Sequence, residues 1–133
     1  MTAEPASPLR VRPARAGDIE AYAATIGKPM VLPTVIAWAG EIDGRVVAIG
    51  GVAIAGGRHR AFIDLQPEAR PWKMTIARSA LRALSHLKAL GVRYIYAEPD
   101  PDEPGAQRWL ASLGFRPDQR SNGALYRWQH FQR

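Results

Sequence analysis

The feature of this sequence that most constrains its fold is a change of hydrophobic period near residue 73. Three stretches before that point have a strand-like composition and are separated by glycine-containing turns, which predicts consecutive antiparallel strands. These stretches are residues 35–42, 45–55 and 59–66. From Lys73 to Leu90 the apolar side chains recur at helical spacing, and residues 92–98 return to a strand pattern. Because the intervening helix crosses over the sheet, strands 59–66 and 92–98 are predicted to be parallel.

Two glycine-containing dipeptides define the first of these turns and the strand that follows it. Asp43-Gly44 predicts a two-residue hairpin, because both central positions of such a turn require positive φ. Gly50-Gly51, in the middle of strand 45–55, predicts a bulge or a close approach of two backbones.

The remaining segments complete one α/β (α+β) domain over residues 9–133, preceded by a disordered leader at residues 1–8. Asp18 is expected to cap the first helix, and Pro104 suits the first turn of the last one. The predicted order is β-α-β-β-β-α-β-α-β-β, a mixed sheet that closes with strand 124–129. An exposed strand edge near residues 124–129 would allow a homodimer.

Composition excludes several kinds of site. The chain has 133 residues and no cysteine, which excludes disulfides, thiolate metal sites and a cysteine nucleophile. Its three histidines have no metal-ligand spacing, so no metal site is expected. No apolar run approaches the ~18 residues of a membrane span, and the N-terminus does not resemble a secretory signal, so a cytoplasmic protein is expected.

The net charge of +6 and pI near 10.3 favour anionic partners. The basic residues are spread along the chain rather than grouped, and neither a recognition helix nor an aromatic platform is apparent. A local site for an anion is therefore favoured over nucleic acid as the partner, although the same arginines could serve only solubility.

Four stretches, in this order and at this spacing, resemble the GCN5-related N-acetyltransferase (GNAT) family from about Leu9 to Gln129. They are VRPARAGDIEAY (11–22), WAGEIDGRVVAIGGV (38–52), IDLQPEAR (63–70) and GAQRWLASLGFRP (105–117). The resemblance implies the fold of a GNAT mixed sheet. It also implies a transferase, specifically an acyltransferase, that passes the acetyl group of acetyl-CoA directly to an amine.

The resemblance also implies where acetyl-CoA would bind. Strands 59–66 and 92–98 would splay apart, and free backbone groups of the first would pair with the pantetheine arm as an added strand would. The pyrophosphate would lie on the following turn, at the N-terminus of the next helix. The implied cofactor-binding residues are Ile63, Asp64, Leu65, Arg70, Trp72, Lys73, Met74 and Thr75.

The sequence departs from the family at two points. The family's phosphate loop is rich in glycine, whereas PEARPWKMT (67–75) contains none, and proline also removes an amide donor. Arg70, Lys73 and Thr75 could replace lost amides through side-chain contacts. The tyrosine that many members use to protonate the leaving thiolate is replaced by Leu110, and its neighbour Trp109 is expected in the core.

An acceptor amine must lose a proton, and Glu98 and Asp64 are the candidate general bases. Glu98 would stand at the mouth of the cleft, at the end of strand 92–98, and Asp64 on strand 59–66. The acidic stretch EPDPDEP (98–104) either attracts a cationic amine or forms a stiff loop whose Asp102 and Glu103 complement the next helix.

Three functions therefore remain open, of which a nucleic-acid-binding module, supported only by the pI, ranks last. One is an acetyl-CoA-dependent N-acetyltransferase whose partners are the coenzyme and a small-molecule or protein amine. The alternative is a catalytically inactive binding or assembly protein of the same fold, such as one of phage or prophage origin. The glycine-free loop and Leu110 both favour this alternative.

Overall fold

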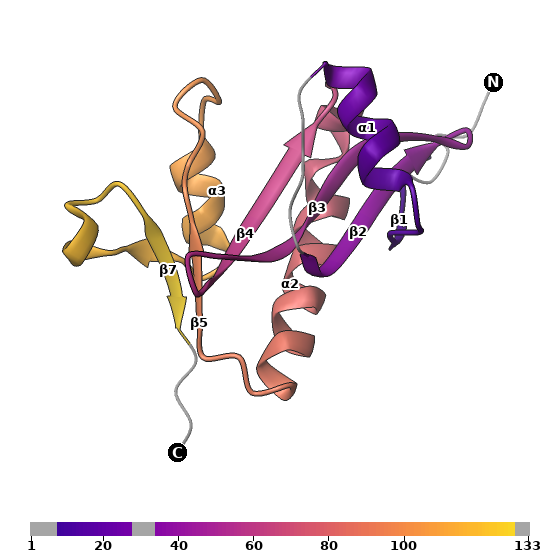
Figure 1. Ribbon diagram of the computed structural model, residues 1–133. Coiled ribbons are helices and arrows are strands. Elements are labelled where there is room, and N and C mark those ends of the chain that lie inside the picture. The colour runs from indigo at the N-terminus through magenta and orange to yellow at the C-terminus, as the bar shows by residue number, and fades with distance from the viewer. Residues whose placement is uncertain (1–7, 28–33, 130–133) are drawn as a thin grey trace.

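The computed structural model describes residues 8–27 and 34–129, which form a seven-stranded mixed sheet with helices on both faces (Figure 1). The strands are β1 (Arg10–Pro13), β2 (Thr34–Ile42), β3 (Arg45–Ala55), β4 (Arg58–Leu65), β5 (Tyr94–Ala97), β6 (Arg116–Pro117) and β7 (Tyr126–Gln129). The helices are α1 (Asp18–Ile26), α2 (Lys73–Ala89) and α3 (Ala106–Ser112), with 3-10 turns η1 (Pro67–Trp72) and η2 (Gln119–Ser121). The predicted element order is confirmed. His130 and most of the expected leader lie outside the described residues.

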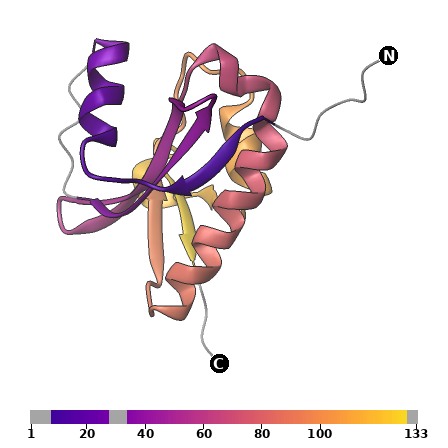
Figure 2. The same ribbon diagram turned by 90° about the vertical axis from the view of Figure 1, so that its right-hand side faces the viewer.

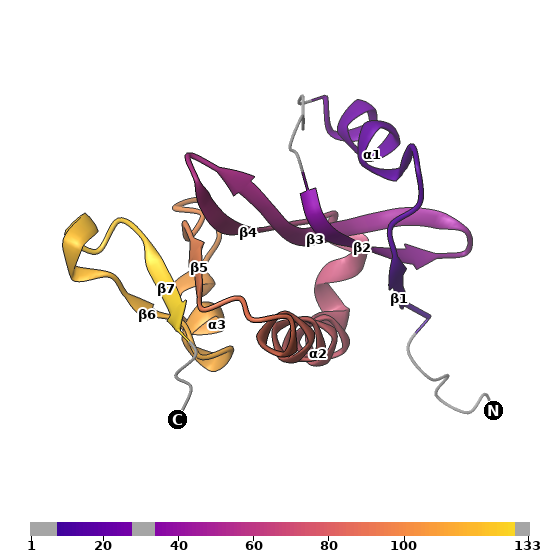
Figure 3. The same cartoon turned by 60° about the horizontal axis from the view of Figure 1, so that its bottom comes forward.

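The core lies on both faces of the sheet. Figures 2 and 3 show α1 on one face and α2 with α3 on the other. On the α1 face, buried Tyr22 packs with Ala39 and Ile49. On the opposite face, α2 and α3 contribute Leu87 and Leu110 to a cluster that also contains sheet residues such as Ile95, Ala97 and Tyr126. The helical stripe predicted for α2 is confirmed, because Ile76, Leu84 and Leu87 are all buried.

The strand order is β1-β2-β3-β4-β5-β7-β6, and β4 and β5 are parallel as predicted. Their pairing is confined to one register position, Arg60 opposite Tyr96, whereas β4 and β3 pair without interruption over eight positions from Ala48–Leu65 to Ala55–Arg58. Beyond Arg60 the two parallel strands diverge, and β4 runs on for five residues to Leu65. The sheet is therefore split along the upper part of β4 (Figure 1).

The turn and glycine predictions are confirmed. Asp43 and Gly44 have φ of 51° and 79°, as the hairpin requires. Gly51 marks a close approach of two backbones, because a Cβ placed on it would lie 2.2 Å from the carbonyl oxygen of Ile36.

Three details of the prediction were wrong. The N-cap of α1 is Gly17, not Asp18, and the Asp18 carboxylate instead accepts hydrogen bonds from the Arg15 amide and the Arg12 side chain. Pro104 does not lie in the first turn of the last helix, which begins at Ala106. Gly105, the N-cap, has a left-handed conformation with φ of 80° and so separates Pro104 from the helix. The segment 124–129 is not the outermost strand, because β7 pairs with β5 along its whole length and with the two-residue β6 at Tyr126 and Arg127. A homodimer therefore stays a proposal without that support.

Candidate coenzyme site

The split between β4 and β5 exposes backbone hydrogen-bonding groups of β4. The amide of Gln66, which follows β4, donates to the carbonyl of Val47 on β3 at 2.8 Å. Because backbone N–H and C=O groups alternate in direction along a strand, those of every second residue before Gln66 also point towards β3. By this alternation the backbone groups of Asp64 point towards β3, whereas those of Ile63 and Leu65 point into the split. Ile63 itself is 42% exposed. An extended chain could add to this edge as a strand does.

The segment after β4 is a packed 3-10 turn rather than an open loop. Residues 67–72 form η1, which runs directly into α2, and Ala69 donates its amide to the Gln66 carbonyl at 2.9 Å. No residue of this segment has positive φ, so its conformation does not require glycine. Ala69 is completely buried, and Trp72 packs against the same core cluster. Fewer amides are left for an anion than in a glycine-rich loop.

The two predicted phosphate-binding cations lie together, and a carboxylate from the acidic loop binds both. Arg70 forms a two-pronged ion pair with Glu103, with distances of 3.0 and 3.1 Å, and the ammonium of Lys73 lies 3.7 Å from the same carboxylate. Glu103 is only 25% exposed in its side chain. Glu103 makes no side-chain cap to α3, so the expectation that its charge complements that helix stays a prediction. Glu103 lies where the predicted anion would bind.

The other residues predicted for the coenzyme differ in accessibility. Met74 is 69% exposed at the first turn of α2, and Thr75 is half-buried with its carbonyl accepting from the Ser79 hydroxyl. Trp72 is half-buried and packs against the core cluster that contains Ala69 and Ile76. Met74 and Thr75 are thus placed at the N-terminal end of α2, beside Lys73.

Asp64, one candidate base, forms a hydrogen bond with a residue that the sequence did not single out. The phenol of Tyr22 donates to the Asp64 carboxylate at 2.5 Å, and the Gln66 side-chain amide lies 3.5 Å from the same phenol. Burial first, and Asp64 second, raise the pKa of Tyr22 above its usual value. A buried tyrosine on an amphipathic helix is an ordinary core residue, so the sequence contains no signal for this contact.

Glu98, the other candidate base, follows β5 immediately and remains accessible. Its side chain is 69% exposed, and one oxygen lies 3.5 Å from the guanidinium of Arg60 on β4. The two candidates therefore flank the split from different strands, Asp64 held by Tyr22 and Glu98 in solvent. The geometry gives Glu98 the greater freedom to meet a substrate.

The position of the family's tyrosine is apolar and lies in the core. Leu110 is 8% exposed and lies in the core, and Trp109 packs half-buried beside it, as expected. Within residues 8–27 and 34–129, no three carboxylate or imidazole groups are arranged to hold a metal ion. No helix in the same ranges is long and apolar enough to cross a membrane.

Comparison with known proteins identifies the fold. No protein-family model matches the sequence, and no curated protein is similar enough to match. Solved structures do match over nearly the whole chain. The ribosomal-protein-S18-alanine N-acetyltransferase of Escherichia coli is 14% identical, with a TM-score of 0.63 over 94% of this chain and 96% of its own.

Two further structures agree with the first. The ribosomal-protein-S5-alanine acetyltransferase of Vibrio fischeri is 14% identical, with a TM-score of 0.66 over 97% of each chain. A GNAT-family N-acetyltransferase of E. coli, solved with CoA, is 11% identical, with a TM-score of 0.66 over 97% of this chain and 85% of its own. The chain has the GNAT fold, as the sequence resemblance implied.

Proposed function

We propose that this protein, which has the GNAT fold, is an acetyl-CoA-dependent N-acetyltransferase of the cytoplasm. The observation that carries the proposal is the split sheet, because β4 pairs with β5 only at Arg60–Tyr96 and then turns backbone groups of Ile63 and Leu65 into the split. The pantetheine arm carries two amide groups with the same hydrogen-bonding pattern as a peptide. An edge that offers alternate amides and carbonyls can bind it as it would a strand.

The chemistry needs no covalent enzyme intermediate. The nitrogen of the acceptor amine attacks the thioester carbonyl, a C–N bond forms, the C–S bond breaks, and CoA leaves as a thiolate. An amide of β4 that faces the split, from Ile63 or Leu65, would donate to the oxyanion. The amine's proton passes to a base, and the thiolate takes a proton from solvent because Leu110 offers none.

The base that best fits this scheme is Glu98. It is solvent-exposed at the end of β5, and only a weak surface ion pair with Arg60 holds it. Asp64 is the second candidate, restrained by the hydrogen bond from Tyr22. Glu98→Gln should lower kcat by about tenfold or more if Glu98 is the base. If only Asp64→Asn does so, the roles are reversed.

For the pyrophosphate we propose Arg70 on η1 with Lys73 and Thr75 at the start of α2, and Met74 beside them. Two cations and the helix N-terminus favour an anion there. Because Glu103 pairs with both cations, the coenzyme must displace this carboxylate. Trp72 would act through packing of η1 rather than by contact with the coenzyme.

A second candidate function is favoured by that same ion pair. If Glu103 permanently satisfies Arg70 and Lys73, the GNAT fold serves as a binding or assembly module that uses no coenzyme. The two functions differ in one measurable property, the affinity for acetyl-CoA and CoA.

Calorimetry and thermal denaturation with each ligand separate the two. A Kd of 100 μM would give about 1.4 kcal/mol of stabilisation at 1 mM ligand, which is a shift of several degrees in Tm for a domain of this size. If acetyl-CoA at millimolar concentration produces neither heat nor a shift, the enzyme function is rejected. If acetyl-CoA does bind, the double variant Arg70→Ala/Lys73→Ala should weaken that binding. Unchanged affinity in the double variant would place the phosphate elsewhere.

A further inference from the structure

A second surface lies on the α1 side of the sheet, over strands that α1 does not cover. On β5, Ile95 and Ala97 point into the core, so Tyr94 and Tyr96 point to the opposite face. Arg60 on β4 and Arg127 on β7 stand directly beside Tyr96 in register, which places the three side chains in one row across the sheet. Figure 3 shows α1 over β2 and β3, with no described helix over β5 and β7 on this side. We call this surface the tyrosine face.

Two arginines of the tyrosine face lie over aromatic rings. The guanidinium of Arg58 lies 4.8 Å from the centre of the Tyr96 ring, and that of Arg127 lies 5.4 Å from the centre of the Tyr94 ring. Within the described part of the chain, no carboxylate pairs with Arg58 or Arg127. At the margin of this surface, Glu98 is paired with Arg60. Arg58 and Arg127 are therefore held by contact with tyrosine rings, and their charges are not neutralised by a described carboxylate.

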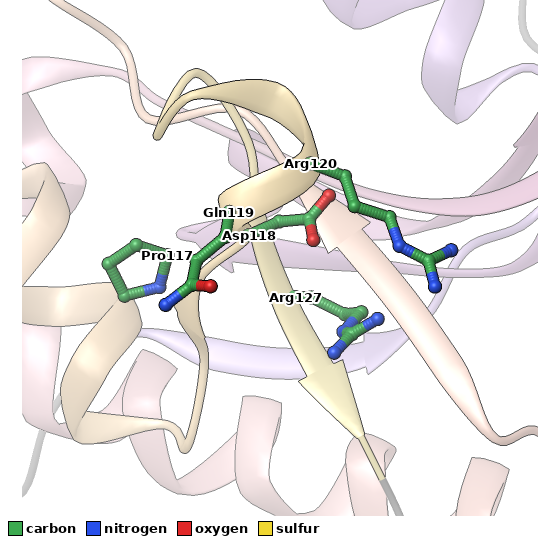
Figure 4. A pocket seen from close by; sticks show the side chains of 5 residues that line it. All are labelled: Pro117, Asp118, Gln119, Arg120 and Arg127. Carbon is green, nitrogen blue, oxygen red and sulfur yellow. The ribbon is translucent and has the colours of Figure 1, made fainter.

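The tyrosine face continues into a pocket at its end. Pro117, Asp118, Gln119, Arg120 and Arg127 line a cavity of about 300 Å³. Figure 4 shows the guanidinium groups of Arg120 and Arg127 pointing to the same side of β7, with Asp118 at the turn above them. Like Arg58, Arg120 has no carboxylate partner among the described residues. A line of cations thus runs from β4, over two tyrosines, to the pocket.

We propose that the tyrosine face binds a single-stranded nucleic acid. Single strands are bound by flat sheet surfaces on which bases stack against aromatic rings or guanidinium planes while basic side chains contact phosphates. Tyr94 is 41% exposed and offers such a ring, and Arg58, Arg120 and Arg127 supply positive charge beside the tyrosines and in the adjoining pocket. The net charge of +6 favours the encounter.

The proposal selects a single strand over other polyanions. A duplex keeps its bases stacked inside and could contact only the arginines. A chain of acidic residues such as polyglutamate has no aromatic rings that could stack on the tyrosines or guanidinium groups. It does not depend on acetyl transfer, since Ile63, Leu65 and the Arg70–Lys73 pair take no part in it. Loss of coenzyme binding would leave the tyrosine face unchanged.

The test uses the full chain and a fluorescein-labelled 12-nucleotide oligouridylate, followed by anisotropy. Arg58→Ala/Arg127→Ala should bind about tenfold more weakly than the unmodified protein. The matched control is Arg78→Ala/Arg82→Ala, which removes the same two charges from exposed positions on α2. The control should lose less than about threefold, because only the long-range field changes. Equal loss in the two variants would overturn the proposal.

Salt dependence and stacking give independent readouts. Each phosphate contact on a single strand contributes about 0.7 to the slope of log K against log salt, so the Arg58/Arg127 variant should reduce the slope by about 1.4. Tyr94→Leu should weaken binding and Tyr94→Phe should preserve it, with melting curves checking that both variants are folded. Equal affinity for a 12-base-pair duplex, or for a polyglutamate peptide of equal charge, would contradict a single-strand site.

Discussion

The guanidinium of Arg70 and the carboxylate of Glu103 form a two-pronged ion pair, with distances of 3.0 and 3.1 Å, across 33 positions of sequence. The ammonium of Lys73 joins the same carboxylate at 3.7 Å. A negative group from the acidic loop therefore occupies the cationic start of α2. Any anion that binds there competes with a tethered carboxylate, which is present at high effective concentration.

Removal of that competitor should raise the affinity for the coenzyme. Glu103→Gln keeps the size of the side chain and removes its charge, so we expect acetyl-CoA to bind at least about threefold more tightly by calorimetry. Asp102→Asn, which removes one charge from the same loop at an exposed position, is the control and should change affinity little. Equal effects of the two variants would show that the loop acts only through its overall charge.

Asp18 should link stability to acidic pH. Its carboxylate accepts a 2.8 Å hydrogen bond from Arg12, which holds the pKa of Asp18 below the ordinary value of 3.8. A lowered pKa in the folded state stabilises the protein above pH 3.8, and this contribution is lost as the pH falls through the folded-state pKa. Asp18→Asn should therefore destabilise by roughly 1–3 kcal/mol at pH 7.

Urea denaturation at several pH values measures this effect. The difference between Asp18→Asn and the unmodified protein should shrink below pH 3.8, where the unfolded chain takes up the proton. Glu20→Gln, on the same first turn of α1 and exposed, controls for the helix dipole. A difference that stays constant down to pH 2 would contradict the role of the Arg12 pair.

Local patterns predicted most of the fold. The Asp43-Gly44 hairpin and the apolar stripe of α2 each depend only on residues close together in the sequence. Both predictions are confirmed. The parallel pair of β4 and β5 followed from the crossover, and the family resemblance supplied the expected split between them. These features need no knowledge of distant side chains.

The site was less predictable because its contacts join distant segments. Nothing near Arg70 indicates that Glu103 will reach it, and nothing near Asp64 indicates Tyr22, which lies 42 positions away. The tyrosine face did leave a signal, because Tyr94 and Tyr96 are two positions apart on one strand and must share a face. Only the pairing of β5 with β7 reveals that Arg127 stands beside them.

Gly51 should be the glycine of β3 that tolerates substitution least. A Cβ there would lie 2.2 Å from the Ile36 carbonyl oxygen and 2.8 Å from the Ala37 Cα, and backbone atoms cannot rotate away. We expect Gly51→Ala to destabilise by about 3 kcal/mol or more in urea denaturation. Gly50→Ala places its Cβ 3.3 Å from the nearest atom and should lose about 1 kcal/mol or less. Similar losses in both variants would be evidence against the close approach.

The most direct test of the proposed coenzyme site is amide hydrogen exchange along β4, measured by NMR with and without saturating acetyl-CoA. The amides of Ile63 and Leu65 face the split, whereas that of Asp64 faces β3. Acetyl-CoA should slow exchange at Ile63 and Leu65 by about tenfold or more relative to Asp64, because an added strand protects only alternate amides. Unchanged ratios among the three amides at saturating acetyl-CoA would contradict binding along β4.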